Sequence, residues 1–265
     1  MLKTFARQFS NLAVYNWRRP ESVQFPTIWS QFERKDKKDN KLRKFRITDV
    51  SDKDKGLQNA LVKHMCDFYL KDEPLFLAMN MREDAKSVQE TEQLWHNIFS
   101  QRIVLACLEE TQDGGLVKSP GTEVPRVVGC NFTFVTKKGQ PKIQPDGKCF
   151  KIFRDANDYL ASFTDCYAHY GVDEYLYAFG LSVDPDYRGM GVAMEILKAR
   201  NEMGRKVGLK ATVTTFTALE SQKLAEKAGY ETLVEKSYEQ MEKDNPLFKF
   251  PGIQTKTAKL MGMKL

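Results

Sequence analysis

The sequence predicts a mixed α/β domain built around one central sheet. Segments with the apolar–polar alternation of strands take turns with segments of helical periodicity, and no internal repeat interrupts this order. The clearest strand, residues 174–183, runs directly into a glycine-containing turn and a helix. The chain has 265 residues, of which 42% are hydrophobic, so it can bury a full core.

Each expected element has a local signal. Ser51 or Asp52 can cap the first helix. Pro185 ends the strand 174–183, because proline has no N–H to donate. Gly229 suits the left-handed position after a helix end. The expected strands cover residues 44–50, 102–108, 127–135, 174–183, 209–215, 230–238 and 252–261; the expected helices cover about 57–69, 87–99, 156–167, 192–207 and 218–228; segments 111–123 and 137–149 are expected loops.

Residues 1–43 are predicted to be a basic N-terminal extension that precedes one domain at 44–265. The charge-rich run 33–44 is typical of a solvated linker. Residues 1–20 carry four basic side chains, no acid and a spaced apolar stripe, which is compatible with a mitochondrial transit peptide. The segment is not serine-rich and has no clear cleavage site, so we expect a cytoplasmic protein, with a mitochondrial one as the alternative.

The composition excludes several classes of function. No window approaches ~18 uninterrupted apolar residues, so no membrane span is expected. The net charge of +6 comes from basic residues interleaved with acidic ones, which argues against nucleic-acid binding. The five cysteines contain no C-x-x-C pair and the three histidines are scattered, so neither a metal site nor a disulfide framework is predicted. A reducing, intracellular setting is the default.

The segment 181–193 is built to hold a phosphate group. It reads as a strand end, a tight turn and a helix start, with glycines that allow close backbone approach and free N–H groups that bind anions. Gly191 is followed by Val192 rather than by the Lys-Ser/Thr of a P-loop, and Met194 stands where a dinucleotide fingerprint needs its third glycine. Both of those motifs are therefore excluded.

Arg188, Gly191 and Ala193 form an Arg-x-x-Gly-x-Ala motif that resembles the pyrophosphate loop of the GCN5-related N-acetyltransferases (GNAT). Three separated pieces, namely 68–75, 181–193, and 226–230 with a late 252–254, resemble the insect arylalkylamine N-acetyltransferases, which include the dopamine N-acetyltransferases. The resemblance covers about 44–265. It implies the GNAT fold: a central mixed, mostly antiparallel sheet flanked by helices and splayed at the strand that carries Leu181–Val183.

The resemblance implies acetyl-CoA as co-substrate, without a metal. Backbone groups of the strand end would pair with the pantetheine arm and polarise the thioester carbonyl, and loop amides with an arginine would hold the diphosphate. The implied cofactor-binding residues are Leu181, Ser182, Val183, Arg188, Gly189, Met190, Gly191, Val192 and Ala193.

The resemblance also assigns catalytic roles. Glu73, in the Lys-Asp-Glu-Pro motif, matches the family's proposed general base, which is needed because a primary amine with a pKa near ~10 is mostly ammonium at neutral pH. The alternative is a polar turn before Pro74. Thr217 and Ser221 match hydroxyls near the thioester sulfur, although the family's serine-rich motif is altered around them. Their alternatives are a helix N-cap and an ordinary exposed residue.

Phe68, Tyr177 and Phe179 are the expected substrate-binding residues. Tyr175, Tyr177 and Phe179 alternate along one strand, so one face could line an aromatic amine pocket, although such stripes are often simply core.

We therefore predict a monomeric acetyl-CoA-dependent N-acetyltransferase for a small primary amine, namely an arylalkylamine such as dopamine, tyramine, octopamine or serotonin. The amine attacks directly, without a covalent acyl-enzyme. The alternatives are a polyamine or aliphatic-amine acceptor, a longer acyl-CoA donor, a non-catalytic CoA-binding module and, more weakly, a protein N-terminal acetyltransferase.

Overall fold

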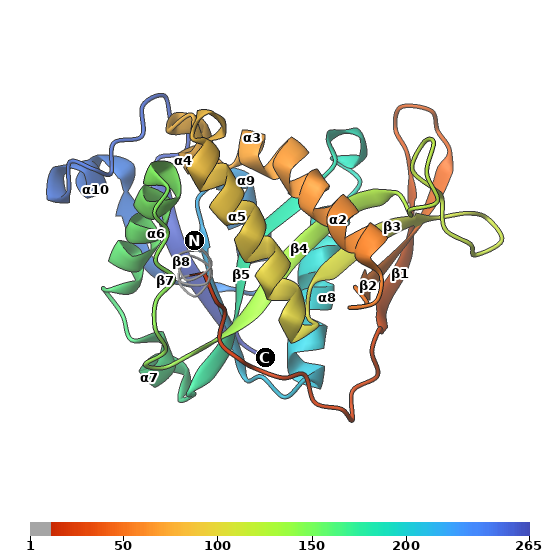
Figure 1. Cartoon of the computed structure of the whole chain (residues 1–265), viewed down its shortest axis with the longest axis horizontal. Coiled ribbons are helices and arrows are strands. Elements are labelled where there is room, and N and C mark those ends of the chain that lie inside the picture. Colours follow the sequence, from red (N-terminus) through yellow and green to blue (C-terminus); the bar gives the residue numbers. More distant parts are fainter. Residues whose placement is uncertain (1–11) are drawn as a thin grey trace, which may run out of the picture.

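The computed structural model of the chain describes residues 12–265, and within them one eight-stranded sheet runs through the molecule (Figure 1). The strand order is β1-β2-β3-β4-β5-β6-β8-β7, and every neighbouring pair is antiparallel except β5 and β6. The strands are β1 (Ile28–Lys35), β2 (Leu42–Asp49), β3 (Leu105–Glu110), β4 (Val127–Lys137), β5 (Glu174–Val183), β6 (Ala211–Phe216), β7 (Glu231–Ser237) and β8 (Thr257–Lys264).

Helices cover both faces of this sheet (Figure 1). They are α2 (Lys55–His64), the π-helix η1 (Met65–Tyr69), α3 (Leu70–Asp72), α4 (Pro74–Ala78), η2 (Met81–Glu83), α5 (Ala85–Ile98), η3 (Phe99–Gln101), α6 (Lys148–Ala161), α7 (Cys166–Tyr170), η4 (Pro185–Tyr187), α8 (Val192–Lys206), α9 (Leu219–Lys227) and α10 (Tyr238–Asp244). None of the helices in residues 12–265 has the length and apolar character needed to cross a membrane.

The sheet separates two hydrophobic cores. Within β3, Ala106 and Leu108 join the core beneath α2, α5 and α6, whereas Leu105 and Cys107 join the core beneath α8. Because successive side chains of a strand point to opposite faces, a strand segment that faces a hydrophobic core on both sides is apolar at successive positions. This explains why 103–108 reads as a continuous apolar run in the sequence.

Strands β5 and β6 pair at a single position. Leu176 lies opposite Thr212, and the remainder of β5 has no partner on this side, although it pairs along its length with β4. The two strands therefore diverge toward the C-terminal end of β5, which confirms the predicted splay at Leu181–Val183. The fold class is confirmed with it.

A bulge in β5 adjoins the divergence. The register with β4 shifts between Asn131 and Thr133, and Gly180 adopts φ +103° there. A Cβ on Gly180 would lie 2.4 Å from the Cε atom of Met65. Glycine is required at this position both for its backbone conformation and for the close approach of η1.

The sheet begins earlier than the sequence predicts. Residues 28–35, placed in the N-terminal extension, form β1 and pair with β2 from Ile28 opposite Thr48 to Lys35 opposite Leu42. The run 33–44 is therefore a strand hairpin and not a solvated linker. Charge misled the prediction because most of the side chains of an edge strand face solvent. Much of the transit-peptide hypothesis falls on residues 1–11, which lie outside the described residues, and it stays a prediction.

Two helix boundaries also differ from the sequence analysis. Asp54, not Ser51 or Asp52, caps α2, accepting a hydrogen bond from the Leu57 N–H at 2.9 Å. Helix α6 begins near Lys148, inside an expected loop, because α5 supplies its N-terminal partners. These partners are Glu90, which accepts from the N–H groups of 146 and 147, and Ser87, which accepts from that of 150. They are distant in sequence, so no local signal marks this start.

The segment before β1 is anchored by a buried ion pair. Arg19 donates to the carboxylate of Asp49 at the end of β2, to the Arg102 carbonyl at 2.8 Å and to the Gln24 carbonyl at 2.6 Å. The side chains of Arg19 and Asp49 are 2% and 0% exposed. Breaking one side of such a pair leaves a buried charge without compensation.

We predict that Arg19→Met lowers the free energy of unfolding by about 3–5 kcal/mol, since it orphans the Asp49 carboxylate. The matched control is Lys38→Met in the β1–β2 hairpin, which breaks the exposed ion pair of Lys38 with Asp186 of η4 and should cost less than about 1 kcal/mol. Chemical denaturation measures both. Equal, small losses would show that the segment is not anchored through Arg19.

Candidate active site

A cavity of about 670 Å³ occupies the divergence of β5 and β6. Its walls come from the α3–α4 connection, the C-terminal half of β5, the start of α8, the end of β6 and the start of α9. Of the residues singled out in the sequence, it brings together Glu73, Tyr177, Phe179, Leu181, Ser182, Val183, Arg188, Ala193, Thr217 and Ser221.

Glu73 lies between α3 and α4 and is 4% exposed. Its Oε2 atom accepts the Phe76 N–H at 2.7 Å, so it caps α4, with Pro74 in the first helical position. The polar-turn interpretation and the functional one thus describe the same residue. The cap fixes the carboxylate in one orientation at the cavity wall.

Thr217 completes the environment of this carboxylate. Its Oγ1 atom donates to Glu73 Oε1 at 2.6 Å, and its carbonyl accepts the Tyr238 hydroxyl at 3.1 Å. The N-cap of α9 is Ala218, so Thr217 does not fill the alternative capping role. Two segments 144 residues apart in sequence therefore meet at one carboxylate.

Burial raises the pKa of Glu73 to about 7, against the lowering effects of the Thr217 hydroxyl and of the N–H groups of Phe76 and Leu75. A carboxyl group with this pKa is present in both protonation states near neutral pH. It can therefore accept a proton and release it again at the pH of the cell, which is what a general base requires.

Ser221 shares the cavity, but its hydroxyl donates to the Ala218 carbonyl at 2.8 Å within the first turn of α9. This bond orients the hydroxyl oxygen and leaves its lone pairs available. Of the two hydroxyls matched to the family, Thr217 is the one in direct contact with Glu73.

The backbone of β5 offers unpaired groups to a ligand. Asp184 donates its N–H to Val128 O at 2.9 Å, and Ser182 lies opposite Cys130 in the same register. Since hydrogen-bonded pairs alternate along an antiparallel ladder, the Ser182 backbone is directed toward β4. The backbone groups of Leu181 and Val183 then face the divergence, where β6 does not reach, and of these the Val183 carbonyl accepts from Arg188 Nε at 3.3 Å.

The loop after β5 retains free amides at the start of α8. Gly189 and Gly191 have φ of +79° and +75°, and no side chain caps the helix. Met190 and Val192 are buried, so their side chains anchor the loop while their N–H groups belong to the helix start. This arrangement suits a diphosphate. Arg188 and Asp72, which both line the cavity, form an ion pair, so a bound diphosphate would compete with Asp72 for the Arg188 guanidinium.

Arg34 is a further cation at this loop, and it comes from β1. The Arg34 Nε atom lies 3.7 Å from the position a Cβ on Gly191 would take, and Nη2 donates to Glu195 of α8 at 2.9 Å. The sequence analysis missed Arg34 because it lies in the segment interpreted as a linker. Only the pairing of β1 with β2 brings it to the loop.

Aromatic side chains form one wall of the cavity. Tyr177 and Phe179 line it, together with Tyr69, Phe153 and Phe216. Phe179 also packs against Trp95 and Phe150 with ring centroids 5.8 and 5.6 Å apart, so it belongs to the core and to the cavity at once. Tyr175 packs on Tyr167, 4.8 Å between centroids, and does not line the cavity.

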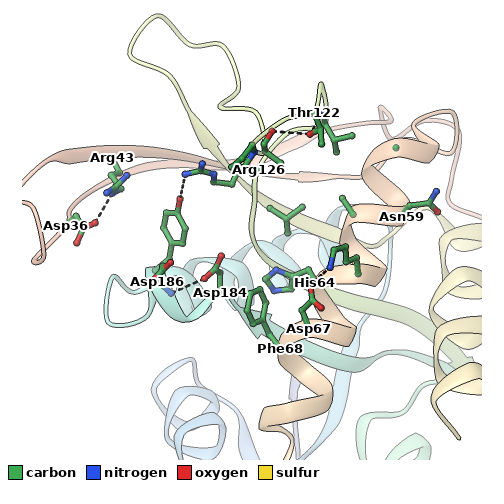
Figure 2. Close-up of a pocket in the computed structure, with 18 of the residues that line it drawn as sticks. Asp36, Arg43, Asn59, His64, Asp67, Phe68, Thr122, Arg126, Asp184 and Asp186 are labelled. Carbon is green, nitrogen blue, oxygen red and sulfur yellow. Dashed lines mark hydrogen bonds and ion pairs between the residues drawn. The ribbon is translucent and has the colours of Figure 1, made fainter. Parts of the chain in front are cut away.

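Phe68 does not line this cavity, contrary to the sequence-based expectation. Its ring packs on His64 at 4.8 Å, at the edge of a second cavity of about 960 Å³ (Figure 2). Helix η1 explains the difference, because a π-turn inserts an extra residue and shifts the register. Tyr69 takes the place in the first cavity that was expected of Phe68.

The second cavity shares no lining residue with the first, and it adjoins the turn before the glycine loop (Figure 2). There the Tyr187 hydroxyl donates to the buried Glu109 carboxylate at 2.6 Å. Arg43 donates to the other Glu109 oxygen at 3.1 Å, and Arg126 to the Tyr187 hydroxyl at 3.4 Å. This cluster ties the turn to β2, to β3 and to the residue before β4, and so positions the loop that follows.

Comparisons with known proteins agree with this geometry. The model of the acetyltransferase (GNAT) family matches residues 130–230. A search of curated proteins gave no match. A crystal structure from the yellow fever mosquito, Aedes aegypti, provisionally named arylalkylamine N-acetyltransferase 7, is 30% identical with a TM-score of 0.82, over 94% of this chain and 99% of that one. The chain belongs to the insect arylalkylamine N-acetyltransferase-like group of the GNAT family.

Two more distant structures share the fold. Arylalkylamine N-acetyltransferase 2 of Aedes aegypti is 19% identical with a TM-score of 0.67, over 83% of this chain and 98% of that one. A Drosophila melanogaster polyamine N-acetyltransferase that forms N-acetylagmatine is 14% identical with a TM-score of 0.59, over 83% and 100%. Membership of the GNAT family makes this protein an N-acetyltransferase that uses acetyl-CoA and an amine.

We predict that Gly180→Ala lowers the free energy of unfolding of this N-acetyltransferase by about 3 kcal/mol, from backbone strain plus the collision with Met65. Gly121→Ala is the matched control: φ is +71° and nothing lies within 4 Å of its Cβ, so only about 1 kcal/mol is expected. Thermal unfolding distinguishes them. Equal losses would mean that the bulge tolerates a side chain.

Proposed function

We propose that this enzyme acetylates a small arylalkylamine and that Glu73 is the general base. The observation that carries the proposal is the buried Glu73 carboxylate, bonded to Thr217 and facing a cavity with an aromatic wall. An uncharged amine must be generated from ammonium before it can attack, and a carboxyl group with a pKa of about 7 is matched to that task.

The reaction proceeds by direct attack. The amine loses a proton to Glu73, its nitrogen forms a bond to the thioester carbon, and the carbon–sulfur bond breaks. The N–H of Leu181 or Val183 faces the divergence and stabilises the oxyanion. The departing thiolate takes the second proton that the nitrogen gives up as the amide forms. The candidate relays at the cavity are the Ser221 hydroxyl, which must turn away from the Ala218 carbonyl to donate, and Thr217, which is bonded to Glu73.

The choice of amine rests on the cavity wall. Tyr69, Phe153, Tyr177 and Phe179 offer apolar and π surface to an aryl ring, and aromatic pairs add stabilisation beyond the area they bury. Of the carboxylates at the cavity, Asp72 is paired with Arg188 and Glu73 is hydrogen-bonded to Thr217, so the negative charge open to a polycation is that of the exposed Glu220. Dopamine, tyramine, octopamine and serotonin fit this description better than polyamines.

We predict that kcat/KM with dopamine rises with pH through about 7 as Glu73 loses its proton. Glu73→Gln should lower kcat/KM by about 10²–10⁴ and remove this limb of the profile, leaving a rise that follows the amine's own pKa near ~10. Free-thiol release from acetyl-CoA across pH 5–10 is the measurement.

The control is Glu220→Gln, which alters an exposed carboxylate at the same cavity and should keep the limb near pH 7. An unchanged pH profile in Glu73→Gln would exclude Glu73 as the base. Turnover of agmatine or spermidine in preference to all four aromatic amines would retain the mechanism and reject the proposed substrate class.

A further inference from the structure

Arg200 is a buried cation at the cavity with no partner of opposite charge. It lies on α8 and is 1% exposed. Its Nη2 atom donates to the hydroxyls of Thr212 and Thr214, each at 2.6 Å, and its Nε atom has no hydrogen-bond partner. Among residues 12–265, no carboxylate lies within ion-pair distance of it.

The two threonines do not neutralise this charge. Each hydroxyl donates its own proton to a backbone carbonyl, Thr212 to Leu176 O at 3.0 Å and Thr214 to Val213 O at 2.7 Å. They therefore accept from the guanidinium as neutral groups. Arginine does not lose its proton in proteins, and a buried charge without a counter-charge is costly. An anion that enters the cavity would supply the missing counter-charge.

The position of Arg200 indicates which part of a ligand it meets. Ala193, Leu197 and Arg200 form one face of α8 along the cavity wall. Ala193 adjoins the glycine loop 188–191, which suits a diphosphate, and seven residues of helix place Arg200 about 10 Å farther along the axis. Its partner Thr212 is the residue that pairs with Leu176, where the divergence closes. The guanidinium therefore lies at the closed end, beyond the strand segment that would bind the thioester.

We propose that Arg200 binds a carboxylate at the far end of the acyl group, so that the enzyme accepts CoA thioesters of short dicarboxylic acids in addition to acetyl-CoA. The proposal rests on the N-acyltransfer function given above. The amine nitrogen bonds to the thioester carbon, the carbon–sulfur bond breaks, and the thiolate takes the proton that the amine releases. The distal carboxylate is unchanged and remains on the amide product.

A carboxylate could also belong to the amine. The acyl donor is the favoured carrier of the carboxylate, because Arg200 shares its helix face with the glycine loop that would hold the CoA diphosphate. Glu73, where the amine must lose its proton, belongs instead to the α3–α4 connection. An acceptor carboxylate would have to pass the thioester to reach the closed end.

The test compares succinyl-CoA with butyryl-CoA, which have the same chain length and differ in a terminal carboxylate. Thiol release with dopamine is measured for the wild type, Arg200→Gln and Arg200→Lys. We expect the wild type to favour succinyl-CoA in kcat/KM. The succinyl-to-butyryl ratio should fall about 10- to 100-fold in Arg200→Gln, the range for a lost hydrogen bond to a charged group, and less in Arg200→Lys, which keeps the charge.

A wild-type ratio below one would overturn the proposal, as would equal losses with both donors in Arg200→Gln, which are the mark of a purely structural role. Should Arg200→Gln fail to fold, the wild-type ratio decides alone. An Arg200-dependent preference for tyrosine over tyramine as acceptor would show that Arg200 binds a carboxylate of the amine, and would reject the proposal that it binds one of the acyl-CoA. If no amine is turned over, the proposed function fails. The role of Arg200 can then still be tested by comparing the thermal shifts that succinyl-CoA and butyryl-CoA produce in the wild type and in Arg200→Gln.

Discussion

The structure depends on the single pairing of β5 with β6, Leu176 opposite Thr212, after which the two strands diverge. Backbone groups in a sheet need partners, and here the backbone of Leu181 and the N–H of Val183 face the divergence, where β6 supplies none. Both faces of the sheet keep the gap open. On one, η1 packs so closely on the β5 bulge that only Gly180 fits; on the other, α8 and its glycine loop are fixed by the core beneath them. The cavity, the glycine loop between β5 and α8, and the Glu73 carboxylate all take their positions from this divergence.

Glu73 has a structural and a chemical role in the same conformation. Its cap of α4 and the Thr217 hydroxyl favour the anion, while burial favours the neutral acid, and burial prevails so that the pKa rises to about 7. Because the folded pKa lies above the ordinary 4.5, the folded state favours the protonated form. The stability that Glu73 contributes is therefore full below pH 4.5 and is lost as the pH rises through about 7. At neutral pH the fold therefore lacks the stability that a protonated Glu73 contributes, which is consistent with the role proposed for this carboxylate.

Features with local signals could be predicted, and features set by distant partners could not. The 174–183 strand, its glycine loop and the position of Glu73 before a proline are all local. The first strand, β1, could not be predicted because the charged side chains of an edge strand face solvent, as those of a linker do, and its pairing with β2 leaves no mark in the charge pattern. No local signal singles out Arg200 in the sequence, because its partners lie on β6. Phe68 was chosen in place of Tyr69 because a π-turn, which no sequence pattern marks, shifts the helix by one residue.

The central claim is that Glu73 exchanges its proton near neutral pH while buried at the divergence. Carbon-13 NMR of protein labelled at glutamate carboxyl groups tests it directly, with the Glu73 signal assigned by its loss in Glu73→Gln. The account predicts a titration midpoint near 7, well above the ordinary 4.5 of a glutamate. A midpoint at or below 4.5 would show that capping outweighs burial, and that Glu73 is a structural carboxylate and not the base.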